Sequence, residues 1–172
     1  MSSCSALADS LHLFFHDCFI SGCDASVLVY TNNFNYVERD SDINLSLPGD
    51  AFNDVILAKT KLEIQCLGVI SRSDIMALAT CDLLLMLMGT FYKVRLGRKD
   101  ALTSAEASVK QNLPLPNITI SEIIKWFADK GFTVHKMVAL FGVHIVGFSR
   151  YKEFVDRTFN HNGKGATPST PA

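Results

Sequence analysis

The chain has 172 residues, of which 48% are apolar and 19% are charged, and its formal net charge is −1. This length suits one domain, or a fragment of a larger one, and can bury roughly two-thirds of the unfolded surface. The near-neutral charge gives no support for binding nucleic acid or an anionic membrane, and the longest apolar run, Leu83 to Met88, is too short to span a bilayer.

The first ten residues, MSSCSALADS, are small and polar and predict a frayed start or the last turn before a helix. They contain neither the basic region nor the apolar region of a signal peptide, so no signal peptide is expected in this chain. The cysteine count of five is odd, so at least one thiol stays unpaired if the chain folds under oxidising conditions.

The next stretch, LHLFFHDCFISGCDASVLVY at residues 11–30, carries most of the candidate chemistry. His12 and His16 are four residues apart, so on a helix both imidazoles project from one face. A lone histidine among phenylalanines is more often a hydrogen-bonded core residue than a catalytic one. Cys18 and Cys23 are compatible with a short disulfide, two buried thiols or half of a zinc site, although no second ligand pair elsewhere completes a zinc tetrahedron.

Oxygen-bearing side chains surround these cysteines. Asp17, Asp24 and Ser26 could cap the next helix or offer ligands to a hard cation such as calcium. Their spacing does not fit an EF-hand. From the residues alone, the stretch is a histidine face beside an oxygen-rich loop that contains two cysteines.

The remaining elements are mostly helical, with almost no strand. Apolar spacing predicts an amphipathic helix over 51–66 with Asp50 as its N-cap, and a more apolar helix over 71–88 at the centre of a core. Residues 91–100 alternate briefly and predict a short strand or an extended link. The proline-containing segment 112–121 is a loop, and it leads to helices at about 122–129 and at 134–146. Asn44 and Asn117 head glycosylation sequons, and Asn44 is expected to point inward.

The segment FFHDCFISGCDASVLV resembles the distal-haem segment of the plant secretory (class III) peroxidases, whose pattern is R-L-x-F-H-D-C-F-x-x-G-C-D-A-S. Further segments resemble this family in its order: Glu38 with Asn44, CLGVISRSDIMALAT, LGRKD, NLPLP, and VALFGVHIVGFSR around His144. The resemblance covers about residues 8 to 160. It implies an all-α, partial haem-peroxidase fold over residues 1–160, with the distal domain and the start of the proximal one, cut short at both ends. Residues 161–172, rich in Gly, Pro, Ser and Thr, are expected to be a disordered tail.

The resemblance also implies roles for individual residues. His16 would be the distal general base and then acid, and Asn44 would orient it by accepting a hydrogen bond from its Nδ1. His144 would be the axial iron ligand of haem b. His12 stands where the family has its catalytic arginine, and a mostly neutral imidazole should stabilise the leaving oxygen poorly. Pro114 would lie at the haem edge, where small phenolic donors bind.

A distal Ca²⁺ site is implied in the same way, and Cys18–Cys23 would close its loop as a disulfide. Ile145 replaces the threonine of a second calcium site, so that site is expected to be lost, and Arg72 and Tyr151 stand where the family has framework cysteines. The residues expected at the distal metal site are Asp17, Ile20 through its carbonyl, Gly22, Asp24, Ser26 and Glu38.

The resulting interpretation is a haem peroxidase that reduces hydrogen peroxide and oxidises small phenolic donors, impaired by its truncation and by His12. It would be a monomer that binds neither nucleic acid nor membrane, and the resemblance implies an extracellular or vacuolar location. An alternative from another class is a catalytically dead, haem-free helical remnant with a binding or structural role. A third is a protein that uses the 17–26 loop only to bind calcium.

Overall fold

The computed structural model describes residues 3–32, 34–115, 118–143, 155 and 159. Within these residues the chain is helical, without a β-strand, which confirms the all-α prediction. The α-helices are α1 Ser3–Ile20, α2 Gly49–Gln65, α3 Arg72–Met86, α4 Glu106–Asn112, α5 Ile120–Asp129 and α6 Val134–Val143. Single 3-10 turns lie at Ser26–Leu28, Glu38–Asp40 and Asn44–Ser46.

Two of the helices begin at side-chain caps. The Ser71 hydroxyl accepts a hydrogen bond from the Asp74 backbone at the start of α3. Thr119 and Glu122 form a reciprocal capping box at the start of α5. At α2 the expected cap is wrong, because the helix starts after Pro48 and Asp50 lies inside its first turn. There the fixed backbone of a proline sets the chain direction, and the carboxylate favours the positive end of the helix instead.

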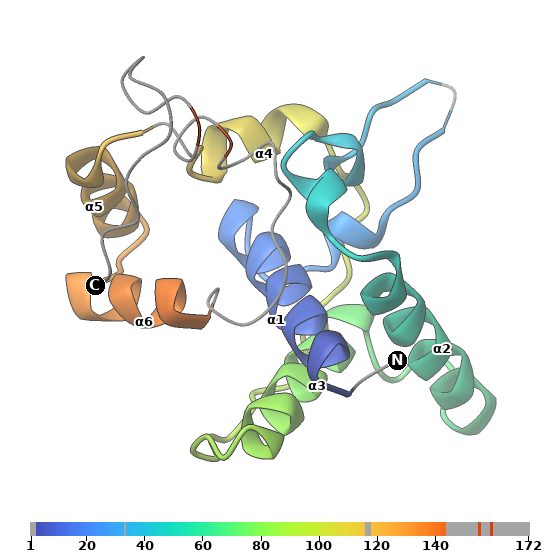
Figure 1. Ribbon diagram of the computed structural model, residues 1–172. Helices are drawn as coiled ribbons and strands as arrows, with labels where there is room; N and C mark the ends of the chain where they lie inside the picture. The colour runs from blue at the N-terminus through green and yellow to red at the C-terminus, as the bar shows by residue number, and fades with distance from the viewer. Residues whose placement is uncertain (1–2, 33, 116–117, 144–154, 156–158, 160–172) are drawn as a thin grey trace.

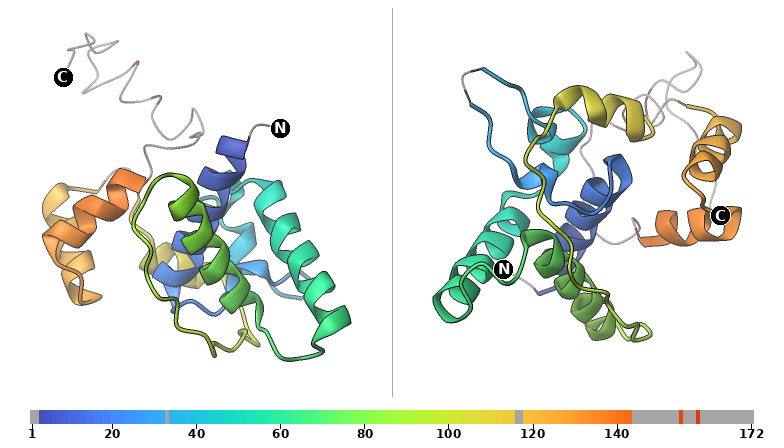
Figure 2. Two further views of the ribbon diagram at one scale, coloured as in Figure 1. Left: turned by 90° about the horizontal axis from the view of Figure 1, so that it is seen from below. Right: turned by 180° about the vertical axis from the view of Figure 1, so that it is seen from behind.

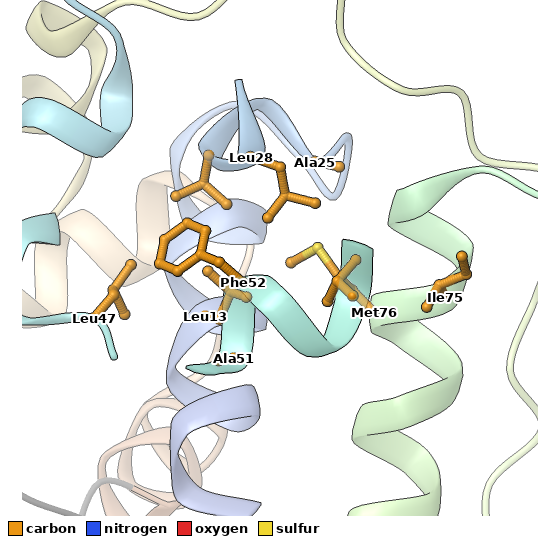
Figure 3. Packing of buried hydrophobic residues seen from close by; sticks show 10 residues of the cluster. Leu13, Ala25, Leu28, Leu47, Ala51, Phe52, Ile75 and Met76 are labelled. Atoms are coloured by element: carbon orange, nitrogen blue, oxygen red, sulfur yellow. The ribbon is translucent and has the colours of Figure 1, made fainter. Parts of the chain in front are cut away.

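The first core packs α1, α2 and α3 together. Leu13 of α1, Phe52 of α2 and Met76 of α3 meet there with the buried loop residues Val27 and Leu28 (Figure 3). The first half of α3 is buried, as its apolar sequence predicted, but its last turn is largely exposed.

The second core joins the C-terminal end of α1 to α4, α5 and α6. Phe19 lies against Phe127 with ring centroids 4.8 Å apart, and Val109, Leu113 and Met137 close the cluster. α1 therefore contributes to both cores and runs between them, with α2 on one side and α5 and α6 on the other (Figures 1 and 2). Packing in both cores therefore positions the side chains of residues 11–20.

Several boundaries differ from those that the sequence predicted. α1 already begins at Ser3, so residues 3–10 are helical rather than a frayed start. α4 and the three 3-10 turns were not predicted, while residues 89–101 form an extended link. The expected end of the last helix at 146 and the expected disordered tail lie outside the described residues. Across the part of the chain that is described, none of the helices combines the length and apolar character needed to cross a membrane.

Candidate functional site

The candidate site is built on the C-terminal half of α1. Because the helix continues unbroken to Ile20, His12 and His16 lie one turn apart, and both are half-buried. The Nε2 atom of His12 is itself buried. Phe15 packs edge-on against His16, with ring centroids 6.0 Å apart.

A hydrogen-bond network fixes the protonation of His16. Asn44 donates from Nδ2 to the Glu38 carbonyl at 2.8 Å, which leaves its Oδ1 to face His16 Nδ1 at 2.7 Å. A carboxamide oxygen can only accept, so Nδ1 of His16 carries the proton and Nε2 is the basic nitrogen. Asn44 is 2% exposed, as its inward orientation required, and its geometry defines a single tautomer of the imidazole.

The oxygen-rich loop folds around the Asp17 carboxylate, which is fully buried. Asp17 accepts the backbone N–H groups of Ala25 at 2.9 Å and Val27 at 3.4 Å. Ala25 has a left-handed backbone with φ 59°, a conformation that alanine adopts at a cost, and the bond to Asp17 holds it there. One turn of α1 therefore presents both His16 and the carboxylate that shapes the loop.

Three carboxylates lie close enough to affect one another's charge. Burial raises the pKa of Asp17 to about 7, with smaller contributions from Asp24 and Glu38 and an opposing one from the two backbone N–H groups. Burial likewise raises the pKa of Glu38, whose Oε2 accepts from the Ser26 hydroxyl at 2.8 Å. Among the described residues, no three His, Cys, Asp or Glu side chains form a ready metal site. In the part of the chain that the structure describes, none of these three carboxylates forms an ion pair, which is an environment that a bound cation relieves.

The Cys18–Cys23 disulfide is present, which confirms the pairing implied by the resemblance. Cys66 is an exposed thiol, and Cys81 is a buried thiol that lies 3.3 Å from the Tyr92 carbonyl. Arg72, in place of a family cysteine, pairs instead with Asp100.

The other expected site residues lie partly within and partly outside the described residues. Ile20 ends α1 and is buried. Gly22, two residues later, has φ 111°, and Pro114 is half-buried just after α4. His144, with Ile145 and Tyr151, lies outside the described residues, so the proximal half of the expected site has no geometry here.

Two residues at the site were not anticipated from the sequence. Ser104 accepts the Glu38 backbone N–H at 3.0 Å, across 66 positions of the chain. Lys130 donates to the Phe19 carbonyl at 2.7 Å and to Asn112 Oδ1 at 2.9 Å. The sequence around Ser104 and Lys130 does not distinguish them from an ordinary surface serine and lysine. Their contacts become visible only in the folded structure.

Comparisons with known proteins identify the family of the chain. The profile of the peroxidase family matches residues 2–171. Peroxidase 63 of Arabidopsis thaliana is 51% identical over 168 residues, which cover 98% of this chain and 51% of the relative. Peroxidase 41 of the same plant is 55% identical over 152 residues, which cover 88% of this chain and 47% of the relative. The chain thus spans about half the length of the curated relatives it matches.

Proposed function

The chain belongs to the peroxidase family, and on this premise we propose that it is a haem-dependent peroxidase that reduces hydrogen peroxide and oxidises small phenolic donors. The observation that carries the proposal is the bond between Asn44 Oδ1 and His16 Nδ1. This bond gives His16 an unprotonated Nε2 on a half-buried helix face, which is what a general base for peroxide needs.

Haem is the cofactor that the family implies, and the distal residues fit it. The described face offers a basic nitrogen beside an aromatic ring, Phe15, and His144 would ligate the iron from the other side. When bound, haem supplies the redox-active iron that accepts the oxidising equivalents of peroxide.

The contribution of the protein is proton transfer at His16. Its Nε2 takes a proton from one peroxide oxygen and returns it to the oxygen that leaves as water. Asn44 keeps Nδ1 protonated throughout, so the ring carries positive charge only between these two transfers. His12, one turn earlier, replaces the family's arginine and offers fewer donors to the leaving oxygen, so we expect slow peroxide reduction.

A calcium ion at the 17–26 loop completes the proposal. Asp17, Asp24 and Ser26, with the carbonyls of Ile20 and Gly22 and with Glu38 nearby, supply the oxygen ligands that calcium prefers. The connection from Ser26 through Glu38 and Asn44 to His16 joins this loop to the base. Calcium would therefore stabilise the position of His16.

The remaining parts of the proposal concern the surroundings of the enzyme. Pro114, beside α4, would form the edge at which phenolic donors bind. The Cys18–Cys23 disulfide supports an oxidising compartment, extracellular or vacuolar, and we propose a monomer. The second candidate is a haem-free helical binding protein, and the specific observation that favours it is His12 in place of arginine.

Titration of the purified chain with haemin, followed by its visible spectrum, tests the function. We expect a saturable Soret shift in the parent chain and in His16→Ala, and none in His144→Ala. His135→Ala is the matched control and should bind as the parent does, because it removes a histidine from the first turn of α6, nine positions before His144 in the sequence. No shift in the parent supports the haem-free candidate, and equal loss in the His16 and His144 variants contradicts the distal and proximal assignment.

A further inference from the structure

One buried residue, Glu38, connects the proposed base to a distant part of the chain. Glu38 is 3% exposed, and its polar groups are bonded to three different segments. Its carbonyl accepts from Asn44 Nδ2 at 2.8 Å, its Oε2 accepts from the Ser26 hydroxyl at 2.8 Å, and its N–H donates to Ser104 Oγ at 3.0 Å. The carbonyl also accepts the Ser41 N–H at 3.2 Å and so closes the 3-10 turn. The position of this turn therefore decides where the carbonyl meets Asn44.

The orientation of the Asn44 amide depends on that carbonyl. The two ends of a carboxamide have nearly the same shape, so packing alone does not distinguish Oδ1 from Nδ2. The Glu38 carbonyl makes the distinction, because it can only accept and so requires Nδ2. Oδ1 then faces His16 Nδ1, which carries the proton. A displaced carbonyl would allow the reversed amide, which would place the proton on Nε2 and leave that nitrogen unable to accept one.

The segment that carries Ser104 is itself attached to the site on both sides of the serine. The Ala101 N–H donates to the Asp24 carbonyl at 2.7 Å, and the Glu106 N–H donates to the Tyr36 carbonyl at 3.3 Å. Backbone bonds that do not involve the serine side chain therefore place its hydroxyl. The same bonds should keep the segment in position when that side chain is replaced.

We propose that Ser104 is a positioning residue for the base, an inference that rests on the proposed function of His16. Because Glu38 is buried, its N–H has little access to water, and removal of the Ser104 hydroxyl would leave a buried donor without a partner. The turn would move to satisfy this donor, and the carbonyl that selects the orientation of the Asn44 amide would move with it. Such support matters, because a catalytic group must be held to within about 0.5 Å of its working position.

Nitrogen-15 NMR of the histidine rings in the full chain, without haem, tests the proposal. Ser104→Val should lower the ratio of Nδ1-protonated to Nε2-protonated His16 about fivefold, which corresponds to the loss of one ordinary hydrogen bond. Ser104→Thr has the shape of the valine variant but keeps the hydroxyl, so it should retain the ratio of the parent. Ser71→Ala is the matched control, because it also removes a serine hydroxyl that accepts a backbone N–H, at the start of α3 and outside this network. It should lower stability and leave the His16 ratio unchanged.

Hydrogen exchange of the Glu38 amide is a second measurement, and its first part needs no variant. The parent should protect this amide, and Ser104→Val should remove most of the protection. The proposal is overturned if the amide exchanges freely in the parent, or if the valine and threonine variants show the same His16 ratio. An equal change of the ratio in Ser71→Ala would also overturn it, since the effect would then follow from lower stability alone. Because these measurements use no haem, failure of the chain to bind haemin would overturn the proposed function and not the role of Ser104 in placing Asn44.

Discussion

The Oδ1 atom of Asn44 lies 2.7 Å from Nδ1 of His16 and connects α1 to a 3-10 turn 28 residues later in the chain. Replacing the amide in Asn44→Val should remove the constraint that keeps the proton on Nδ1. It should also cost about 1–3 kcal/mol of stability, because the Glu38 carbonyl and His16 both lose a buried partner.

Nitrogen-15 NMR of the histidine rings measures the first effect directly and needs no haem. The parent should show His16 protonated at Nδ1, and Asn44→Val should show a mixture of tautomers. Asn53→Val, at an exposed position of α2, is the matched control and should leave the His16 signal unchanged. A parent spectrum with the proton on Nε2 would refute the tautomer derived from the network.

The pKa of Asp17, raised by burial to about 7, predicts how stability depends on pH. Between pH of about 4 and about 7 the folded chain holds a proton on Asp17 that the unfolded chain has released, so the free energy of unfolding falls as pH rises. The slope from this group is up to about 1.4 kcal/mol per pH unit, and the contribution is complete only below pH of about 4. Urea unfolding at several pH values in the presence of a chelator should show this fall in the parent and a flatter profile in Asp17→Asn.

If calcium binds at the 17–26 loop, the free energy that it contributes to folding should rise with pH, opposite to the trend expected in the presence of a chelator. The ion requires the ionised carboxylate, so its affinity should rise by up to tenfold per pH unit below pH of about 7 and level off above. Calorimetry at pH 6 and pH 8 measures the change. The same affinity at both values, or unchanged binding by Asp17→Asn, would exclude Asp17 as a ligand.

The parts of the molecule that the sequence could predict are those with a local pattern. Apolar spacing gave α2, α3, α5 and α6 to within a few residues, and the i, i+4 spacing gave the shared face of His12 and His16. The seven-residue helix α4 was not predicted, because it is too short to show a clear helical period of apolar residues. Its one fully buried residue, Val109, packs on helices that are distant in the sequence. The 3-10 turns depend on bonds such as Ser26 to Glu38, which no local spacing encodes.

The contacts of Lys130 are also not encoded by any local sequence pattern, and they support a prediction about stability. Its ammonium group binds the Phe19 carbonyl near the C-terminal end of α1, where helix carbonyls lack intrahelical partners and positive charge is favoured. It also binds Asn112 of α4, so one side chain connects α1, α4 and α5. Lys130→Met keeps the apolar part of the side chain and should destabilise the fold by about 2 kcal/mol.

Urea denaturation measures this effect against Lys125→Met, which replaces an exposed lysine of α5 and should change stability by less than about 0.5 kcal/mol. Hydrogen exchange should also become faster in α5 and α6 of the Lys130 variant, because their attachment to α1 is weakened. Equal stability of the two variants would show that the aromatic cluster alone holds these helices.

The last prediction concerns His12, whose replacement by arginine should raise the rate of peroxide reduction once haem is bound. Arginine presents several N–H donors from a permanently charged group, whereas a neutral imidazole presents one. One additional donor to the departing oxygen is worth about 10²-fold in rate, roughly 2.7 kcal/mol. Haem affinity should hardly change, because His12 is not an expected iron ligand.

Stopped-flow mixing of haem-loaded His12→Arg and parent with hydrogen peroxide measures the change in rate, and His12→Lys separates charge from shape. Lysine carries the same charge as a compact ammonium group without the planar fork, so it should recover only part of the gain. His16→Ala in the arginine background should lose the gain, because the added donors act on an oxygen that must still receive its proton from His16 Nε2. If the arginine variant reacts no faster than the parent, His12 does not limit the peroxide step, and the slow step lies with the proximal side of the haem, where His144 is the expected ligand.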